Sequence, residues 1–176
     1  MPRVAAYIRL LRPENDALMG LIVIVGAIVG GGRLPPAAEA TVGFLVGFTL
    51  SASAMVLNDI ADVDIDRVND PTRPLPSGQV STREAWISFA ALSAIGLALA
   101  LYQGLAEAVI ASASYVVAVA YDLRGKRYGL PGNAMVAFTG VSPIIYGAVM
   151  VDGLRGVVWL EATMIFLAMM GREVVK

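Results

Sequence analysis

Residues 42–69 read VGFLVGFTLSASAMVLNDIADVDIDRVN, an uncharged run followed directly by an acidic one. The first part, residues 42–57, holds no charged side chain and is rich in Val, Leu, Ala and Gly. With its flanks it approaches the roughly 17–25 residues that a helix needs to cross a bilayer. The second part, residues 58–69, carries four Asp and two Asn. The stretch therefore predicts a membrane-spanning helix that ends in a cluster of oxygen-bearing side chains.

The same kind of apolar segment recurs along the rest of the chain. Hydrophobic residues make up 57% of the sequence, whereas soluble domains contain about 45–50% apolar residues. The mean hydropathy is +0.72. Five further apolar segments lie at residues 17–32, 85–102, 105–121, 134–151 and 157–170. We therefore expect an all-α polytopic bundle of six transmembrane helices in a single domain, residues 1–176. Residues 1–16 mix charged and apolar side chains and predict a short interfacial helix, not a cleaved signal peptide.

Basic residues are distributed unevenly among the connections between these segments. Eleven of the 13 lie in alternate connections, and only Arg33 and Arg155 lie in the others. The positive-inside rule places the richer side in the cytoplasm. We therefore expect a multi-pass protein of the cell membrane with a cytoplasmic N-terminus and cytoplasmic polar loops. The net charge of −1 gives no indication of nucleic-acid binding, and nothing in the sequence indicates an oligomeric state.

The acidic motif has a helical periodicity. On one continuous helix, residues three and four apart share a face. Five side chains then fall within roughly a quarter of a turn, whereas Asp64 points elsewhere: they are Asn58, Asp59, Asp62, Asp66 and Asn69. Carboxylates stacked in this way repel one another. Since the sequence has no His and no Cys, a compensating cation would be held by oxygen atoms, which suits Mg²⁺. Mg²⁺ commonly shares its shell with phosphate oxygens, so a bound diphosphate is expected.

Two polar connections lie on the same side as this motif. Residues 70–78 contain three Pro and a Gly, which predict a turning path, and Arg73 is placed to meet an anion. Residues 122–132 contain the basic triplet Arg124, Lys126 and Arg127, which could bind phosphate. Both sets of basic residues could equally serve only as topology determinants.

Two other interpretations of the acidic motif stay open. It could be a solvated loop with acidic helix ends. It could also belong to the cation pathway of a transporter, in which case further carboxylates are expected inside other spans. Residues 134–151 hold none, and Glu84 and Glu107 lie only at the margins of their spans, which counts against transport.

The sequence resembles the UbiA superfamily of intramembrane prenyltransferases. The resemblance covers almost the whole chain and rests on Asn58-Asp59-x-x-Asp62-x-x-x-Asp66, followed by Asn69, Arg73-Pro74 and Pro76-Ser77-Gly78. It is supported by Arg12-Pro13-x-Asn15 and by Tyr121, Lys126, Arg127 and Gly132-Asn133. Within the superfamily, the stretch 10–20 looks most like archaeal digeranylgeranylglyceryl phosphate synthases. Residues 171–176 are similar to the stretch just before that group's second Asp-rich motif.

The resemblance implies a helical bundle, usually of nine spans, in which two Asp motifs bind Mg²⁺. About six spans are present here, so we expect a chain truncated at its C-terminus. Implied metal ligands and catalytic residues are Asn58, Asp62 and Asp66, with Lys126 also catalytic. Implied substrate-binding residues are Arg12, Asn15, Asp59, Arg73, Tyr121, Arg127 and Asn133.

The implied reaction is transfer of a geranylgeranyl or other polyprenyl group from its diphosphate. The implied acceptor is the hydroxyl of geranylgeranylglyceryl phosphate, a lipid phosphate, and the prenyl tail would lie among the apolar spans next to membrane lipid. An aromatic acceptor of quinone or haem biosynthesis is the alternative within the superfamily.

Overall fold

The computed structural model describes residues 3–175, and the side chains of residues 3–172, as a bundle of helices. No strand occurs among these residues. In chain order the elements are α1 (Arg3–Leu11), α2 (Pro13–Gly31), α3 (Ala37–Ala61), α4 (Val63–Asn69), α5 (Thr82–Gln103), α6 (Leu105–Leu123), the 3₁₀ turn η1 (Gly125–Arg127), α7 (Leu130–Met150) and α8 (Gly156–Val175). The expected all-α bundle and the short N-terminal helix before the first span are both confirmed.

Five of these helices, α2, α3, α5, α6 and α7, are long and apolar enough to cross a membrane. They form because a spanning segment must satisfy its own backbone N–H and C=O groups in lipid, and a helix does so. The sixth expected span corresponds to α8, which is a helix of 20 residues but is not among the five. Helix α8 carries three charged residues within its length, Glu161, Arg172 and Glu173.

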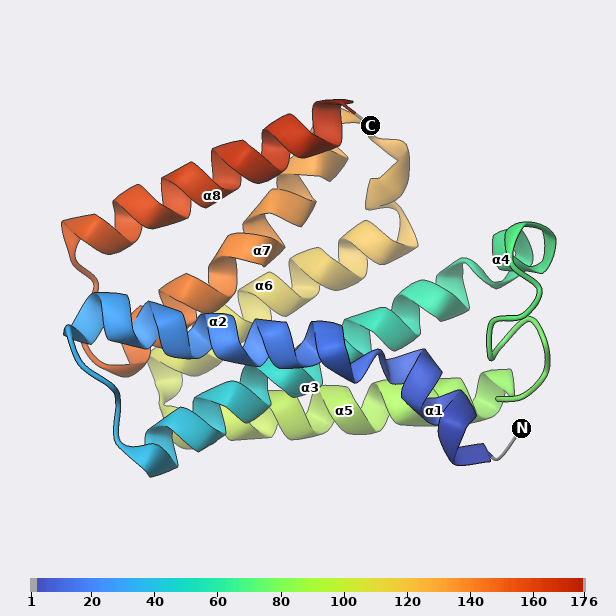
Figure 1. Ribbon diagram of the computed structural model, residues 1–176, viewed down its shortest axis with the longest axis horizontal. Coiled ribbons are helices and arrows are strands. Elements are labelled where there is room, and N and C mark those ends of the chain that lie inside the picture. The colour runs from blue at the N-terminus through green and yellow to red at the C-terminus, as the bar shows by residue number, and fades with distance from the viewer. Residues whose placement is uncertain (1–2, 176) are drawn as a thin grey trace.

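The helices run back and forth between two ends of the bundle (Figure 1). One end, which we call the polar end, holds α1, α4, the 70–81 loop, η1 and the C-terminal end of α8. Arg33 and Arg155 lie in the connections at the opposite end. The described part of the chain thus separates the two sets of basic residues as the topology prediction requires; Lys176 lies outside the described residues.

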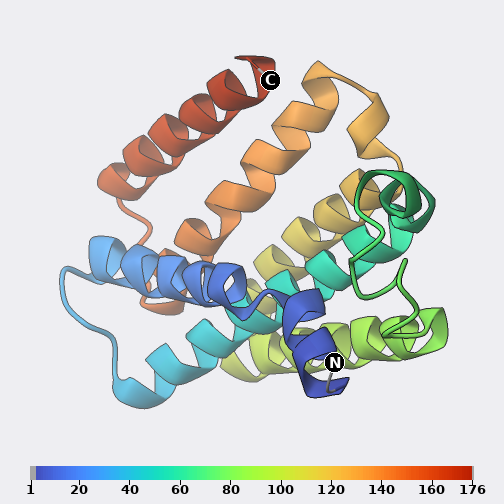
Figure 2. The same ribbon diagram turned by 45° about the vertical axis from the view of Figure 1, so that its right-hand side comes forward.

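Helix α3 occupies the middle of the bundle and packs most extensively against α5 and α2. Helix α2 in turn packs against α7, and α7 lies beside α8 (Figure 2). The α2–α7 crossing is close because Gly26 and Gly147 face the partner helix: a Cβ at either position would overlap a backbone carbonyl, that of Ile144 or of Val23. Small residues allow such close approach between helices in lipid.

The 70–81 loop is anchored to the bundle by apolar contacts. Leu75 and Val80 of the loop are buried in one cluster with Leu10 of α1 and Val56 of α3. The loop turns as the prolines predict, and Gly78 has a φ of 71°, which glycine adopts without steric cost. This cluster fixes the position of the polar residues that the loop carries between its anchors.

The acidic motif is not one continuous helix, and this part of the sequence prediction was wrong. Helix α3 ends at Ala61, Asp62 adopts φ −97° and ψ 6°, and α4 begins at Val63. The new direction exposes Asn69, which the continuous helix had placed with the carboxylates. Asp64 is exposed, as predicted, and pairs with Arg67 at 2.6 Å. The prediction failed because periodicity assumes a single helix axis, whereas α4 is held by contacts at the polar end.

Candidate functional site

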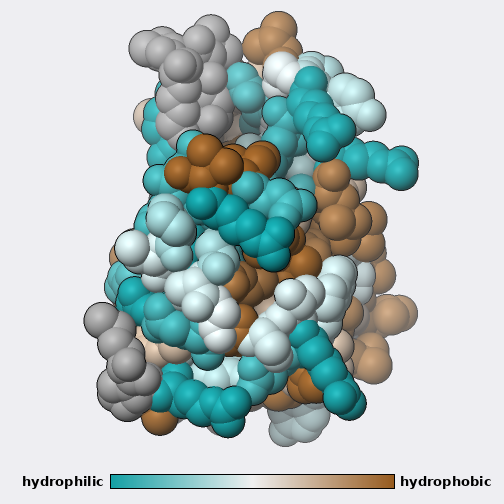
Figure 3. Space-filling view, turned by 90° about the vertical axis from the view of Figure 1, so that its right-hand side faces the viewer, coloured by the Kyte–Doolittle hydropathy of each residue, from teal (hydrophilic) through white to brown (hydrophobic). Residues whose placement is uncertain are grey.

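The acidic motif lies at the polar end, where hydrophilic side chains gather on the surface of the molecule (Figure 3). Two of its carboxylates are nonetheless buried: Asp59 is 2% exposed and Asp66 is 7% exposed. Buried charges need partners. The surrounding elements supply three cationic side chains, each from a different segment of the chain.

The first cation is Arg12, which lies between α1 and α2. Its Nη2 donates a hydrogen bond to Asp59 Oδ1 at 2.7 Å. Arg12 has a left-handed backbone, with φ 53° and ψ 58°. The following residue, Pro13, disfavours the right-handed helical conformation for Arg12 and so separates the two helices. The turn at Arg12 thus sets its guanidinium over the end of α3.

The second cation is Arg73, carried by the 70–81 loop. Its Nη1 lies 2.6 Å from Asp66 Oδ2 and 3.5 Å from Asp59 Oδ1. Burial by itself lowers the pKa of Arg73, but its hydrogen bond to Asp66 and the charges of Asp59, Asp66 and Asp70 raise that pKa above its ordinary value. Arg73 therefore stays charged and joins α3 to α4.

The third cation is Lys126 of η1. Its Nζ donates a hydrogen bond to Asp62 Oδ2 at 2.7 Å and lies 3.8 Å from Asp122 Oδ1. Asp122, in the last turn of α6, also accepts a hydrogen bond of 2.9 Å from Asn58 Nδ2. The end of α6 and the following η1 are thus tied to the end of α3 through four side chains, Asp122, Lys126, Asn58 and Asp62.

These contacts form two groups of polar side chains at the end of α3, which we together call the polar cluster. One group holds Arg12, Asp59, Arg73 and Asp66, and the other holds Lys126, Asp62, Asp122 and Asn58. The polar cluster consists of four carboxylates, three cations and one amide: Asp59, Asp62, Asp66, Asp122, Arg12, Arg73, Lys126 and Asn58. It brings together all three proposed metal ligands and four further residues that the sequence singled out.

The donor atoms of the polar cluster fit Mg²⁺ shared with phosphate oxygens. Among the described residues, no three acidic side chains come together closely enough to hold an ion by themselves. Mg²⁺ does not require this, since it is usually bound by one or two carboxylates together with waters and phosphate oxygens. Asn58, Asp62 and Asp66 supply oxygen atoms of that kind, and the neighbouring cations suit the phosphates.

The remaining predicted site residues lie around the polar cluster. Asn15 and Arg127 are exposed, and Asn133 is half-buried in the first turn of α7. The interactions of the described residues do not connect these three side chains to the polar cluster. Tyr121 is half-buried, and its ring lies close to the backbone of Gly125 and Gly132.

Sequence reasoning missed two buried carboxylates. Asp122 is the first residue of the polar connection expected at residues 122–132, but α6 continues to Leu123 and directs the Asp122 side chain towards Asn58. Asp16, in the first turn of α2, is fully buried and accepts a hydrogen bond of 2.7 Å from Ser51 of α3. The available sequence signal for Asp122 was its position next to Tyr121. The signal for Asp16 was its position directly before the apolar segment 17–32.

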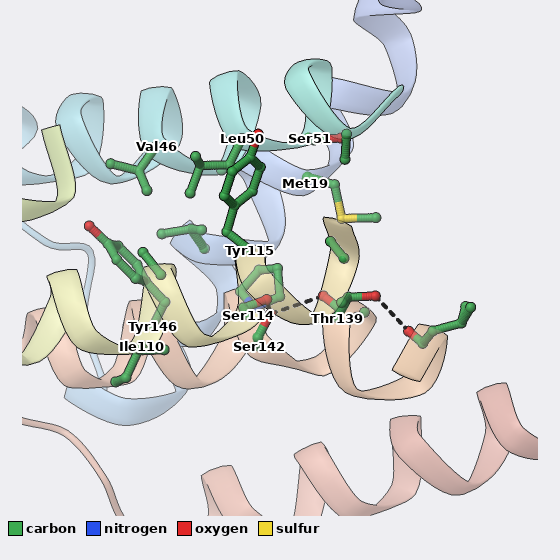
Figure 4. A pocket seen from close by; sticks show the side chains of 18 of the residues that line it. Met19, Val46, Leu50, Ser51, Ile110, Ser114, Tyr115, Thr139, Ser142 and Tyr146 are labelled. Carbon is green, nitrogen blue, oxygen red and sulfur yellow. Dashed lines mark hydrogen bonds between the residues drawn. The ribbon is translucent and has the colours of Figure 1, made fainter. Parts of the chain in front are cut away.

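An apolar cavity of about 360 Å³ lies between α2, α3, α6, α7 and α8 (Figure 4). Its α3 wall runs from Val46 to Met55, one turn short of Asn58. Several polar groups in its walls have partners: Ser114 pairs with Ser142 of the same lining, and Tyr115 pairs with Ser53 and Ser93, which lie outside the lining. Tyr146, also in the wall, donates a hydrogen bond to Gln103 Oε1. The polar cluster thus begins one helical turn beyond the Met55 end of the cavity, which we call the apolar chamber.

Comparison with known proteins agrees with this architecture. Digeranylgeranylglyceryl phosphate synthase of Thermococcus kodakarensis is 38% identical over 174 residues, which cover 97% of this chain and 61% of that protein. A solved digeranylgeranylglyceryl phosphate synthase has a TM-score of 0.87 at 28% identity, covering 97% of this chain and 59% of its own.

A UbiA homologue from Archaeoglobus fulgidus, solved with GPP and Mg²⁺, has a TM-score of 0.77 at 23% identity, covering 94% of this chain and 66% of its own, and shares the fold. The chain spans about three fifths of the length of the curated relatives that it matches. Residues 19–174 match the model of the UbiA prenyltransferase family. With its apolar helices and its polar cluster, this membrane-embedded, multi-pass chain belongs to the UbiA prenyltransferase family.

Proposed function

We propose that the protein transfers a geranylgeranyl group from its diphosphate to the hydroxyl of geranylgeranylglyceryl phosphate, in a Mg²⁺-dependent reaction. The observation that carries the proposal is the polar cluster at the end of an apolar chamber. A prenyl diphosphate has the same two parts, a charged head and an apolar tail. Relatives named digeranylgeranylglyceryl phosphate synthase at 38% and 39% identity support the choice of donor and acceptor.

The head group is bound by the polar cluster. Asn58, Asp62 and Asp66 would hold Mg²⁺, which when bound neutralises diphosphate charge and so makes it a better leaving group. Mg²⁺ and GPP in the Archaeoglobus fulgidus homologue are in keeping with this. Arg73 and Lys126 supply fixed positive charge for the departing diphosphate, with Arg127 close to Lys126 in the chain.

The tail lies in the chamber, whose walls exclude water from the allylic carbon. The C–O bond to the diphosphate breaks and the diphosphate leaves with the bonding electron pair. The acceptor oxygen forms a new C–O ether bond, and the proton of its hydroxyl passes to the departing diphosphate. Asp59, held by Arg12, completes the cluster beside the donor. Asn15, Tyr121 and Asn133 remain proposed substrate contacts around it. The proposal places all of these residues on the cytoplasmic side.

The acceptor is tested with the whole gene product that contains these residues, in membranes. Radiolabelled geranylgeranyl diphosphate is offered with geranylgeranylglyceryl phosphate or with an aromatic acid. We expect labelled ether lipid and release of pyrophosphate, both dependent on Mg²⁺. Product from the aromatic acid alone would show a quinone-type or haem-type transferase, and ion flux without pyrophosphate release would show a transporter.

The metal assignment is tested by Asp62→Ala. We expect loss of transfer by at least about 10²-fold, since removal of one electrostatic stabiliser costs roughly that much. The matched control is Asp64→Ala, in the same motif, because Asp64 is exposed and, among the described residues, pairs with Arg67 and not with the polar cluster. Both variants should insert into the membrane. Wild-type turnover of Asp62→Ala would contradict the assignment.

A further inference from the structure

The orientation of the Asn58 amide decides whether this residue can bind a cation. The carbonyl oxygen of an amide accepts and can coordinate a metal, whereas its NH₂ group only donates. A rotation of the side-chain amide by half a turn exchanges the two. An asparagine ligand therefore needs a neighbour that distinguishes oxygen from nitrogen.

Asp122 is such a neighbour. An ionised carboxylate only accepts hydrogen bonds, so it favours the NH₂ side of the amide. Asp122 Oδ1 lies 2.9 Å from Asn58 Nδ2, and Asp122 is 8% exposed. Because Asn58 Nδ2 donates to Asp122, the carbonyl oxygen of Asn58 is the side-chain atom available to a metal ion.

The same carboxylate also faces Lys126. Lys126 Nζ lies 3.8 Å from Asp122 Oδ1 and 2.7 Å from Asp62 Oδ2. Asp122 and Lys126 are four residues apart and belong to α6 and η1, whereas Asn58 and Asp62 are four residues apart at the end of α3. Two pairs from distant parts of the chain thus meet. Asp122 contacts Lys126 of its own pair and Asn58 of the other pair.

We propose that Asp122 is a positioning residue, which turns the carbonyl oxygen of Asn58 towards the metal–diphosphate site and keeps Lys126 beside Asp62. This inference rests on the proposed function, because it assigns Asn58 as a ligand. Asp122 does not itself touch the metal. Its function is to fix one ligand atom and one cation before the substrate binds.

The test uses Mn²⁺, a paramagnetic substitute for Mg²⁺, so that binding is measured without turnover. Its affinity for the whole gene product is determined by electron paramagnetic resonance with an unreactive geranylgeranyl thiolodiphosphate. Asp122→Asn replaces the carboxylate with an amide of nearly the same shape, which can donate as well as accept. The contact then no longer favours the amide nitrogen of Asn58 over its oxygen. We expect Mn²⁺ affinity to fall about 10- to 100-fold, the usual effect of removing the partner that orients a metal ligand.

A double variant in which Asn58 and Asp122 exchange side chains gives a sharper test than the single variant Asp122→Asn. In Asn58→Asp alone, two carboxylates face each other and Mn²⁺ affinity should fall. In Asn58→Asp combined with Asp122→Asn, the amide at position 122 donates to the new carboxylate at position 58, whose second oxygen can bind the metal. We expect the double variant to recover Mn²⁺ affinity to within a few-fold of wild type. A purely structural role for either residue does not predict this rescue.

The outcomes separate the inference from the proposed function. Asp64→Asn, in the exposed part of the motif, is the control and should bind Mn²⁺ as wild type does. Wild-type affinity of Asp122→Asn would overturn the inference and leave prenyl transfer standing. Failure of the double variant to recover, with a thermal unfolding temperature like that of wild type, would make Asp122 a direct ligand and also overturn it. Normal Mn²⁺ results without prenyl transfer would instead refute the proposed function.

Discussion

Arg12 combines a strained backbone with an ion pair to a buried carboxylate. Its φ of 53° is one of two positive values at non-glycine residues in the described part of the chain. A left-handed conformation costs such a residue roughly 1–2 kcal/mol. The hydrogen bond from Arg12 to Asp59 offsets this cost, since a bond between charged groups contributes about 1.5–3 kcal/mol. Strain of this kind concentrates at functional sites.

The first prediction compares glycine and alanine at position 12. Both Arg12→Ala and Arg12→Gly lose the ion pair to Asp59 and should be less stable than wild type. Arg12→Gly also relieves the backbone strain, so it should be more stable than Arg12→Ala by roughly 1 kcal/mol. Unfolding of the protein in detergent, followed by circular dichroism, measures the difference.

Arg9 is the control for this comparison, because it lies within α1 and is exposed. There the order should reverse, with alanine more stable than glycine by about 0.5–1 kcal/mol. If alanine were the better residue at both positions, the left-handed backbone of Arg12 would carry no strain.

A second residue-scale prediction concerns Asp16 and Ser51. Asp16 is fully buried, and within the described part of the chain its Oδ2 has no hydrogen-bond partner, so Ser51 supplies the one bond that the side chain makes there. Ser51→Ala leaves both oxygens unsatisfied and should destabilise the protein by about 1–3 kcal/mol. Replacing both partners, with Asp16→Leu added to Ser51→Ala, should restore most of the loss because no buried polar group remains.

Detergent unfolding of the two single variants and the double variant measures this coupling. Ser88→Ala is the control, since Ser88 bonds only to the carbonyl of Glu84 in its own helix. Its effect on stability should be small. Simple addition of the two single effects would mean that Asp16 and Ser51 do not depend on each other.

At the scale of elements, the 70–81 loop shows how apolar contacts place a charged group. The loop has little regular structure, yet Arg73 reaches Asp66 and Asp59 because Leu75 and Val80 fix the segment that follows it. The break at Asp62 has a matching effect, since it turns α4 so that Asp66 faces Arg73. Neither element is held by its own hydrogen bonds alone.

The third prediction is that Leu75→Ala loosens this loop. A leucine that is 7% exposed leaves a cavity when truncated, which costs about 2–5 kcal/mol. Part of the lost stability weakens the packing of the loop, so a protease should cleave residues 70–81 faster. Affinity for the donor should also fall, because Arg73 is no longer held in place. Leu34→Ala, at the opposite end and 72% exposed, should behave as wild type. Equal cleavage rates for the two variants would contradict this account of the loop.

At the scale of the whole molecule, the ends of the bundle differ in charge and in chemistry. The polar end carries the polar cluster and most of the basic residues, and the other end consists of short connections. The cytoplasmic position of the polar end is a prediction from that charge distribution. If it is correct, donor and acceptor head groups meet the protein from the cytoplasm.

The fourth prediction tests this orientation directly. The chain has no cysteine, so single cysteines report cleanly on their surroundings. Ser77→Cys in the 70–81 loop should react with an impermeant maleimide only in inverted vesicles. Leu34→Cys, at the opposite end, should react in intact cells. The reverse pattern would refute the predicted orientation, and the proposed function would then require substrates on the outer side.

From the amino-acid sequence alone one can predict the apolar helices, their order, and the family signature of residues 58–69. These properties depend on composition and on local spacing, which a single chain segment carries. The sequence also indicated correctly that Asp64 points away from the other carboxylates of the motif, because the direction of a side chain relative to residues one turn away is a local property of the helix.

The partners of the carboxylates follow instead from the way the helices pack. The pairing of Asn58 with Asp122 and the burial of Asp16 against Ser51 join segments that lie far apart in the sequence. The break at Asp62 separates two consecutive helices, and Asp66 of the second helix pairs with Arg73 of the 70–81 loop. Hydropathy and periodicity describe one helix at a time. The partners of a buried charge depend on which helices pack together, and that was fixed by close crossings such as Gly26 on Ile144 and by the anchoring of the 70–81 loop.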